Sequence, residues 1–168
     1  MTQQRLLSVL SMLAASLLAL LPLAASAAPM TLDVRGTIGR TNDVDHSVYH
    51  FSEADLLKLP VHTITTSTTW TPKVTFSGPL LSDVLKVVDA RADGVELRTI
   101  DDYSYTVSAR EADHYGAILA YSMNGVRLTV SNFGPLFLIY PRDAYPAELT
   151  GSGEEAKFVW QIKGMVVK

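Results

Sequence analysis

The sequence of 168 residues contains no cysteine. This excludes disulfide bonds, thiolate nucleophiles, and zinc or iron–sulfur centres held by cysteine. Hydrophobic residues make up 48% of the chain and charged residues 18%, which is typical of a globular protein. The formal net charge of −3 leaves too little basic excess to neutralise phosphates, so we expect no nucleic-acid partner. The fold therefore depends on its hydrophobic core, and its chemistry on oxygen and nitrogen groups.

The N-terminal segment differs from the rest of the chain. Arg5 is its only charged residue, and a Leu- and Ala-rich run over 6–23 follows. The small residues Ala25-Ser26-Ala27 then form a site of the kind that signal peptidase cleaves. We predict a secretory signal peptide over 1–27, a single domain over 28–168 and a periplasmic location. An uncleaved signal anchor is the alternative, and it would export the same domain.

Most of the remaining chain follows strand patterns. Short segments that alternate in polarity or are rich in β-branched residues are separated by turns such as Asn124-Gly125. We expect a first hairpin from the segments 32–38 and 48–51. The segments 61–70 and 71–76 are expected to form two strands or one bent strand. Further strands are expected at 95–100, 103–107, 118–122, 126–130, 135–140 and 158–167.

Helical signals are fewer. Apolar residues at helical spacing behind Gly78-Pro79 predict one main helix over 80–90. Ser52 with Asp55, and Ser108 with Glu111, indicate two short capped turns of helix. The segment 145–156 is rich in Gly, Glu, Pro and Ser and is predicted to be a surface loop. The expected fold is α+β, predominantly β, with a mixed sheet or partial barrel and one main helix.

Catalytic patterns are sparse. His46 and His50 lie an even number of residues apart, so on a strand they share a face that either binds a metal or is solvated. Asp101-Asp102 is either a carboxylate pair or a solvated turn. The sequence has no nucleophile-elbow, dinucleotide-binding or phosphate-loop motif. These patterns favour a binding protein over an enzyme.

Aromatic and polar residues gather at the ends of the predicted strands. A flat polar heterocycle needs an aromatic face for stacking, a carboxylate that accepts from amino and ring N–H groups, and a donor for a ring carbonyl. Trp70 either supplies such a face or fills the core, and Arg142 either binds ligand or pairs with Asp143 on the surface. The candidate ligand-binding residues are Trp70, Asp101, Asp102, Tyr103, Asn132, Tyr140 and Arg142.

Five short motifs occur in a fixed order between residues 76 and 162. They are Phe76-Ser77-Gly78-Pro79-Leu80-Leu81-Ser82-Asp83-Val84-Leu85, Asp101-Asp102-Tyr103, Met123-Asn124-Gly125, Asn132-Phe133-Gly134-Pro135-Leu136 running to Pro141, and Val159-Trp160 with Ile162. This order resembles the molybdopterin-binding domain of the sulfite oxidase family. Trp70 before the first motif and Tyr140-Pro141 at the end of the fourth resemble its small exported members, some of which bind pterins and report to a membrane partner.

The sequence also departs from the enzymes that it resembles. Those enzymes ligate molybdenum through a Cys thiolate, and this chain has none. Asn132 and Phe137 stand where the enzymes usually carry His and Arg. The resemblance therefore implies a pterin-type ligand without molybdenum, with Trp70 stacking on the ring and Asp102 or Asn132 contacting its edge.

The resemblance also implies a function and a partner. We expect an exported, non-enzymatic pterin-binding module that reports its small heterocyclic ligand to an inner-membrane sensor or a cyclic di-nucleotide signalling protein. The alternative is a subunit of a molybdopterin-dependent oxidoreductase.

Overall fold

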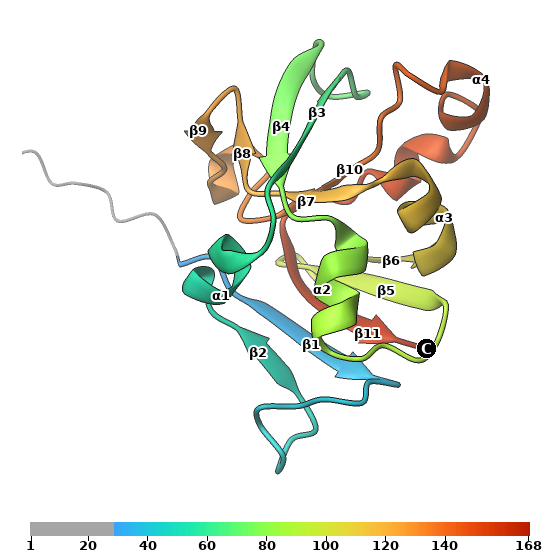
Figure 1. The fold of residues 1–168 in the computed structure, drawn as a ribbon. Helices are drawn as coiled ribbons and strands as arrows, with labels where there is room; N and C mark the ends of the chain where they lie inside the picture. Colours follow the sequence, from blue (N-terminus) through green and yellow to red (C-terminus); the bar gives the residue numbers. More distant parts are fainter. Residues whose placement is uncertain (1–28) are drawn as a thin grey trace, which may run out of the picture.

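The computed structural model describes residues 29–168 (Figure 1). The predicted signal peptide over 1–27 lies outside the described residues, so export and periplasmic location remain predictions. Within the described part of the chain, no helix combines the length and the apolar character needed to cross a membrane.

A five-stranded sheet forms the lower half of the molecule in Figure 1. Its order is β2 (Tyr49–Phe51), β1 (Leu32–Gly36), β11 (Ile162–Val167), β5 (Gly94–Thr99) and β6 (Ser104–Ser108). β1 and β11 pair in parallel, whereas the other neighbours are antiparallel. The sheet is therefore mixed, as predicted, and the expected hairpin of β1 and β2 is confirmed by the pairing of Leu32 with Phe51.

A second sheet has four antiparallel strands. Its order is β3 (His62–Thr66), β4 (Val74–Gly78), β8 (Ser122–Met123) and β9 (Val126–Arg127). The β3–β4 hairpin projects at the top of Figure 1, and a buried two-stranded ladder of β7 (Ile118–Ala120) and β10 (Phe137–Ile139) lies below it. The predicted strand at 71–76 starts only at Val74, because residues 67–73 form the loop of the hairpin.

β4 and β7 approach each other very closely at Gly78. A Cβ atom added to Gly78 would lie 1.9 Å from the Leu119 carbonyl oxygen. The Leu119 N–H donates to the Pro79 carbonyl at 2.8 Å, which holds the two backbones together. The Gly-Pro pair of the first motif is therefore explained by backbone contact, which leaves no room for a side chain.

Short helices cover the strands. They are α1 (Glu53–Lys58), α2 (Leu81–Val87), α3 (Ala109–Tyr115) and α4 (Pro146–Leu149), with 3-10 turns η1 (Val130–Asn132) and η2 (Glu154–Lys157). Both predicted caps are present: Ser52 and Asp55 form a capping box, and the Ser108 side chain accepts from the Glu111 N–H. α3 is as long as α2, so residues 29–168 contain two helices of this size where the sequence predicted one. Likewise, α4 and η2 occupy the predicted surface loop over 145–156.

α2 is shorter than the predicted helix over 80–90. Asp89 adopts a left-handed conformation with φ 52°, and the Ala90 N–H donates back to the Leu85 carbonyl at 3.0 Å. This arrangement ends a helix by satisfying its last carbonyl groups. The apolar periodicity continues to Val88, which explains why spacing alone predicted a later end.

His46 and His50 are held by carboxylates. The His46 Nδ1 lies 2.9 Å from Asp43 Oδ2, while the His50 Nε2 lies 3.3 Å from the same oxygen and its Nδ1 lies 2.7 Å from Asp33 Oδ1. Among residues 29–168, no group of three or more His, Cys, Asp or Glu side chains is arranged to hold a metal ion. The geometry therefore favours a protonated His50 ring that joins β1, β2 and the loop between them.

This arrangement predicts a pH-dependent contact at the β1–β2 edge. Hydrogen bonds to Asp33 first, and then to Asp43, raise the pKa of His50. A raised folded-state pKa adds stability below the unfolded value, and this stability is lost as the pH rises through the folded value. The hydrogen bond from His46 lowers the pKa of Asp43, so the Asp43 contribution is lost only as the pH falls through that lowered value.

An NMR titration of the His50 ring checks this prediction. The midpoint is expected above the ordinary histidine value of about 6.5 and should fall in Asp33→Asn. A midpoint that is the same in wild type and Asp33→Asn would contradict the arrangement.

Candidate ligand-binding site

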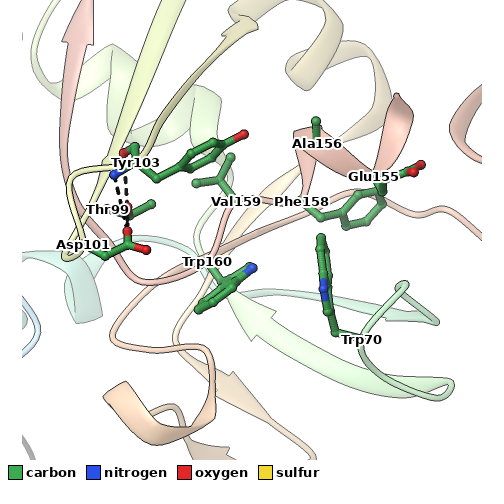
Figure 2. A pocket seen from close by; sticks show the side chains of 9 residues that line it. All are labelled: Trp70, Thr99, Asp101, Tyr103, Glu155, Ala156, Phe158, Val159 and Trp160. Atoms are coloured by element: carbon green, nitrogen blue, oxygen red, sulfur yellow. Dashed lines mark hydrogen bonds between the residues drawn. The ribbon is translucent and has the colours of Figure 1, made fainter. Parts of the chain in front are cut away.

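A cavity of about 320 Å³ opens between the β3–β4 hairpin and the β5–β6 end of the five-stranded sheet (Figure 2). Three stretches of the chain line it: the loop of the hairpin, the turn between β5 and β6, and the segment from η2 toward β11. The lining residues are Trp70, Thr99, Asp101, Tyr103, Glu155, Ala156, Phe158, Val159 and Trp160.

Trp70 forms one wall of the cavity. Its side chain is 43% exposed, so it does not fill the core, and it meets Trp160 edge to face with ring centroids 6.5 Å apart. The Thr68 hydroxyl oxygen accepts from the Trp70 N–H at 3.1 Å and from the Thr71 N–H at 3.0 Å. The backbone on both sides of Trp70 is therefore fixed by its own loop.

Trp160 is anchored by the core. It packs edge to face on Phe133 with centroids 6.0 Å apart, and Phe133 stacks on the buried Phe137 at 5.4 Å. Phe158 is also buried and contacts the Tyr140 ring from the core side. Figure 2 shows Trp70 to the right of Trp160 and Tyr103 above it. The cavity therefore offers several aromatic faces, at least one of which is rigidly held.

The turn between β5 and β6 supplies a carboxylate. Asp101 accepts hydrogen bonds from the Thr99 hydroxyl and, at 3.4 Å, from the Tyr103 N–H. The Thr99 bond first, and then the Tyr103 bond, lowers the pKa of Asp101. Asp101 is therefore an anion at neutral pH, and an anionic carboxylate accepts hydrogen bonds from N–H groups of a ligand.

The structure brings together three of the seven candidate residues. Trp70, Asp101 and Tyr103 line the cavity, whereas Asp102 does not. Asp102 has a left-handed backbone with φ 64°, and its carboxylate pairs in solvent with Lys163 Nζ at 2.8 Å. Because neighbouring residues of this turn point in different directions, the lining carboxylate is Asp101.

The other three candidates lie outside the lining. Asn132 ends η1 and donates its N–H to the Thr129 carbonyl. Tyr140 is fully buried, its ring packs on Tyr115 and Phe158, and burial raises the pKa of its phenol. Arg142 is half-buried just beyond β10. Their proposed contacts with ligand stay predictions from the sequence.

Sequence reasoning missed Glu155. It lies on η2, inside the segment predicted to be a surface loop, and it gives the lining a second carboxylate. The acidic pair Glu154-Glu155, separated by two residues from the apolar run Phe158-Val159-Trp160, was the available signal. Phe158 and Val159 also belong to the lining, although their pattern predicted only a strand.

The cavity is acidic. Its lining contains Asp101 and Glu155 and no basic side chain. The nearby Lys157 is engaged elsewhere, with Nζ 2.5 Å from Glu111 and 2.7 Å from Glu154. The site therefore suits a flat ligand that presents N–H donors and carries no negative charge.

Comparison with known proteins identifies the family. A profile described as the oxidoreductase molybdopterin binding domain matches residues 41–145, which is more than half of the chain. This chain belongs to that family. The molybdopterin-binding-domain fold expected from the ordered motifs is thereby confirmed, as is the predominantly β, α+β class.

A solved structure supports the same fold. The chain is similar to the sulfane dehydrogenase SoxCD of Paracoccus pantotrophus, with a TM-score of 0.58 and 15% identity. The similarity covers 82% of this chain and 37% of that chain, so this protein spans well under half the length of its structural relative. No curated protein matches the sequence.

Molybdopterin fits the cavity only in part. Aromatic faces and carboxylates suit the pterin ring, whose amino and ring N–H groups donate hydrogen bonds. The phosphate of molybdopterin would meet Asp101 and Glu155 without a lining cation. The sequence also supplies no Cys, and residues 29–168 offer no metal-holding group. The aromatic faces and carboxylates of the lining therefore suit the ring part of the group, whereas the lining holds no cation to pair with its phosphate.

Proposed function

We propose that this member of the molybdopterin-binding domain family is an exported, non-enzymatic module that binds a pterin-type heterocycle and reports it to a membrane partner. One observation supports the proposed ligand. The cavity combines Trp70, Trp160 and Tyr103 with the carboxylates of Asp101 and Glu155. The indole and phenol rings stack on the flat ring system, and a carboxylate accepts from its amino and ring N–H groups.

The proposed partner is an inner-membrane sensor or a cyclic di-nucleotide signalling protein. Its identity rests on the resemblance to small exported pterin-binding proteins. Ile100 and Tyr103, which are 41% and 50% exposed, place apolar surface beside the cavity. A partner that packs there would sense whether the neighbouring site is filled.

The alternative function is that of a molybdopterin-dependent oxidoreductase subunit, which is equally compatible with membership of the family. The two functions differ in metal content. An oxidoreductase subunit purified from the periplasmic fraction would carry molybdenum close to one atom per chain, whereas the proposed module would carry none.

Calorimetric titration with a pterin and with its phosphate ester tests the proposal. Saturable binding of the pterin is expected, with the ester binding about tenfold more weakly at low salt. Two unit charges about 6 Å apart in water repel by about 0.7 kcal/mol, so Asp101 and Glu155 together cost the ester about 1.4 kcal/mol, which is a factor of about ten. The difference in affinity between the pterin and its ester should become smaller as salt is added, because salt screens the repulsion.

Two variants that reverse the charge of a carboxylate test whether the lining causes the weaker binding of the ester. Glu155→Lys should remove the preference against the ester, whereas Glu148→Lys, at an exposed position of α4 outside the lining, should leave it unchanged. Absence of binding by any pterin, or stoichiometric molybdenum in the purified protein, would overturn the proposed function.

A further inference from the structure

The loop over residues 67–73, which carries Trp70, is held together by its own hydrogen bonds. We call it the Trp70 loop. The Thr68 N–H donates to the Thr71 carbonyl at 3.1 Å, and the two hydroxyl oxygens lie 2.9 Å apart. Thr68 and Thr71 are both buried. Because the loop is held together internally, Trp70 moves only if the loop moves as a unit or breaks these bonds.

Asp143 holds the base of the Trp70 loop on both sides. Its Oδ1 accepts from the Ser67 N–H at 3.1 Å and from the Ser67 hydroxyl at 2.6 Å. Its Oδ2 lies 3.5 Å from Lys73 Nζ, at the other end of the loop. Its backbone N–H donates to the Thr66 hydroxyl at 3.0 Å. One residue therefore joins the start and the end of the loop.

Asp143 also connects the Trp70 loop to the core. It lies between β10, whose residues are fully buried, and α4. β10 pairs with β7, and Phe137 of β10 packs on the Phe133 ring that supports Trp160. Both tryptophan walls of the cavity are therefore connected to β10. Trp160 is connected through Phe133, and Trp70 is connected through Asp143.

We propose that Asp143 is a positioning residue that sets the distance between the Trp70 wall and the Trp160 wall, so that ligand affinity depends on a carboxylate outside the lining. The effect on ligand rests on the proposed function, whereas the placement of Trp70 does not. Asparagine at this position would keep an acceptor for Ser67 but lose the charge that faces Lys73. Alanine would lose both.

The chain offers a matched control in Asp55. Its Oδ2 accepts from the Ser52 N–H at 3.1 Å and from the Ser52 hydroxyl at 2.6 Å, and its Oδ1 lies 3.4 Å from Lys58 Nζ. These are the same kinds of contact that Asp143 makes. Asp55 belongs to α1 and does not line the cavity. Asp55→Ala therefore removes equivalent bonds at a site where they cannot place Trp70.

Calorimetric titration with pterin tests the ligand arm of the proposal. Asp143→Ala is expected to weaken binding about tenfold, because the loop must then be ordered by the ligand itself. Asp143→Asn should fall between wild type and Asp143→Ala, and Asp55→Ala should match wild type. The placement arm needs no ligand. In a Trp160→Phe background, acrylamide quenching of Trp70 fluorescence should increase with Asp143→Ala and not with Asp55→Ala.

The titration and the quenching measurement distinguish failure of the proposed function from failure of the positioning role of Asp143. If wild type binds no pterin, the proposed function fails, and the quenching comparison still decides the role of Asp143. If Asp143→Ala leaves both pterin affinity and Trp70 quenching unchanged, the positioning role is wrong. Should Asp143→Ala not fold, as judged by circular dichroism, then Asp143→Asn and Lys73→Met give the same comparison with fewer bonds lost.

Discussion

Trp70→Ala is expected to weaken pterin binding by about 1–3 kcal/mol, the range measured when a stacking aromatic is removed from beneath a base. The melting temperature should stay close to that of wild type, because Trp70 is 43% exposed and its loop is held by Thr68, Thr71 and Asp143. Calorimetric titration measures the first effect and differential scanning calorimetry the second.

Tyr145→Ala is the control for Trp70→Ala. Tyr145 is similarly exposed, at 40%, and lies outside the cavity lining, so its loss should not change pterin affinity. A Trp70→Ala variant that binds pterin as wild type does would remove Trp70 from the site. A loss of about 3–5 kcal/mol in stability would instead show that Trp70 acts as a core residue.

Gly78→Ala is expected to give the largest loss of stability, at or above the upper end of the range of about 1–3 kcal/mol for overpacking. The new Cβ would lie 1.9 Å from the Leu119 carbonyl oxygen, which belongs to the backbone of β7 and cannot rotate away. β4 would have to separate from β7 and give up the hydrogen bond from Leu119 to Pro79. Urea unfolding of wild type and variant measures the difference.

Comparison with Gly125→Ala shows how much of the stability loss in Gly78→Ala comes from the close approach of the two backbones rather than from the conformational strain of replacing a glycine. Gly125 has φ 76°, and a Cβ there would meet no atom within 4 Å. Its substitution should therefore cost only the strain of a left-handed alanine, about 1 kcal/mol. Equal losses for the two glycines would mean that the contact with Leu119 relaxes without cost.

Local signals predicted local structure well. Both helix caps depend on residues three apart, and both formed as expected. The insertion of β11 between β1 and β5 could not be predicted in this way, because it joins residues more than 60 positions apart. Hydrophobic patterning shows that a strand is half-buried, but it does not name the neighbouring strand.

Candidate lining residues could be predicted from the sequence where their residue type has few other roles in proteins. Trp70 and Tyr103, exposed aromatics beside strand ends, were found from the sequence, and both line the cavity. Asp101 and Asp102 could not be told apart, because their directions depend on the backbone conformation of the turn. Glu155 was missed since an acidic residue in a polar loop is most often solvated. Tyr140 is buried although Pro141 and Arg142 follow it, because it directly follows the buried strand β10 and its ring packs on Tyr115 and Phe158.

The cavity walls come from three stretches that lie far apart in the sequence. A ligand that touches all three would cross-link the folded chain without a covalent bond, as disulfides do in many exported domains, and this chain has no cysteine with which to form one. Because the unfolded chain has no such cavity, ligand at 100 times Kd would add about 2.7 kcal/mol to stability. Resistance to heat and to proteases would then report what fraction of the sites is filled.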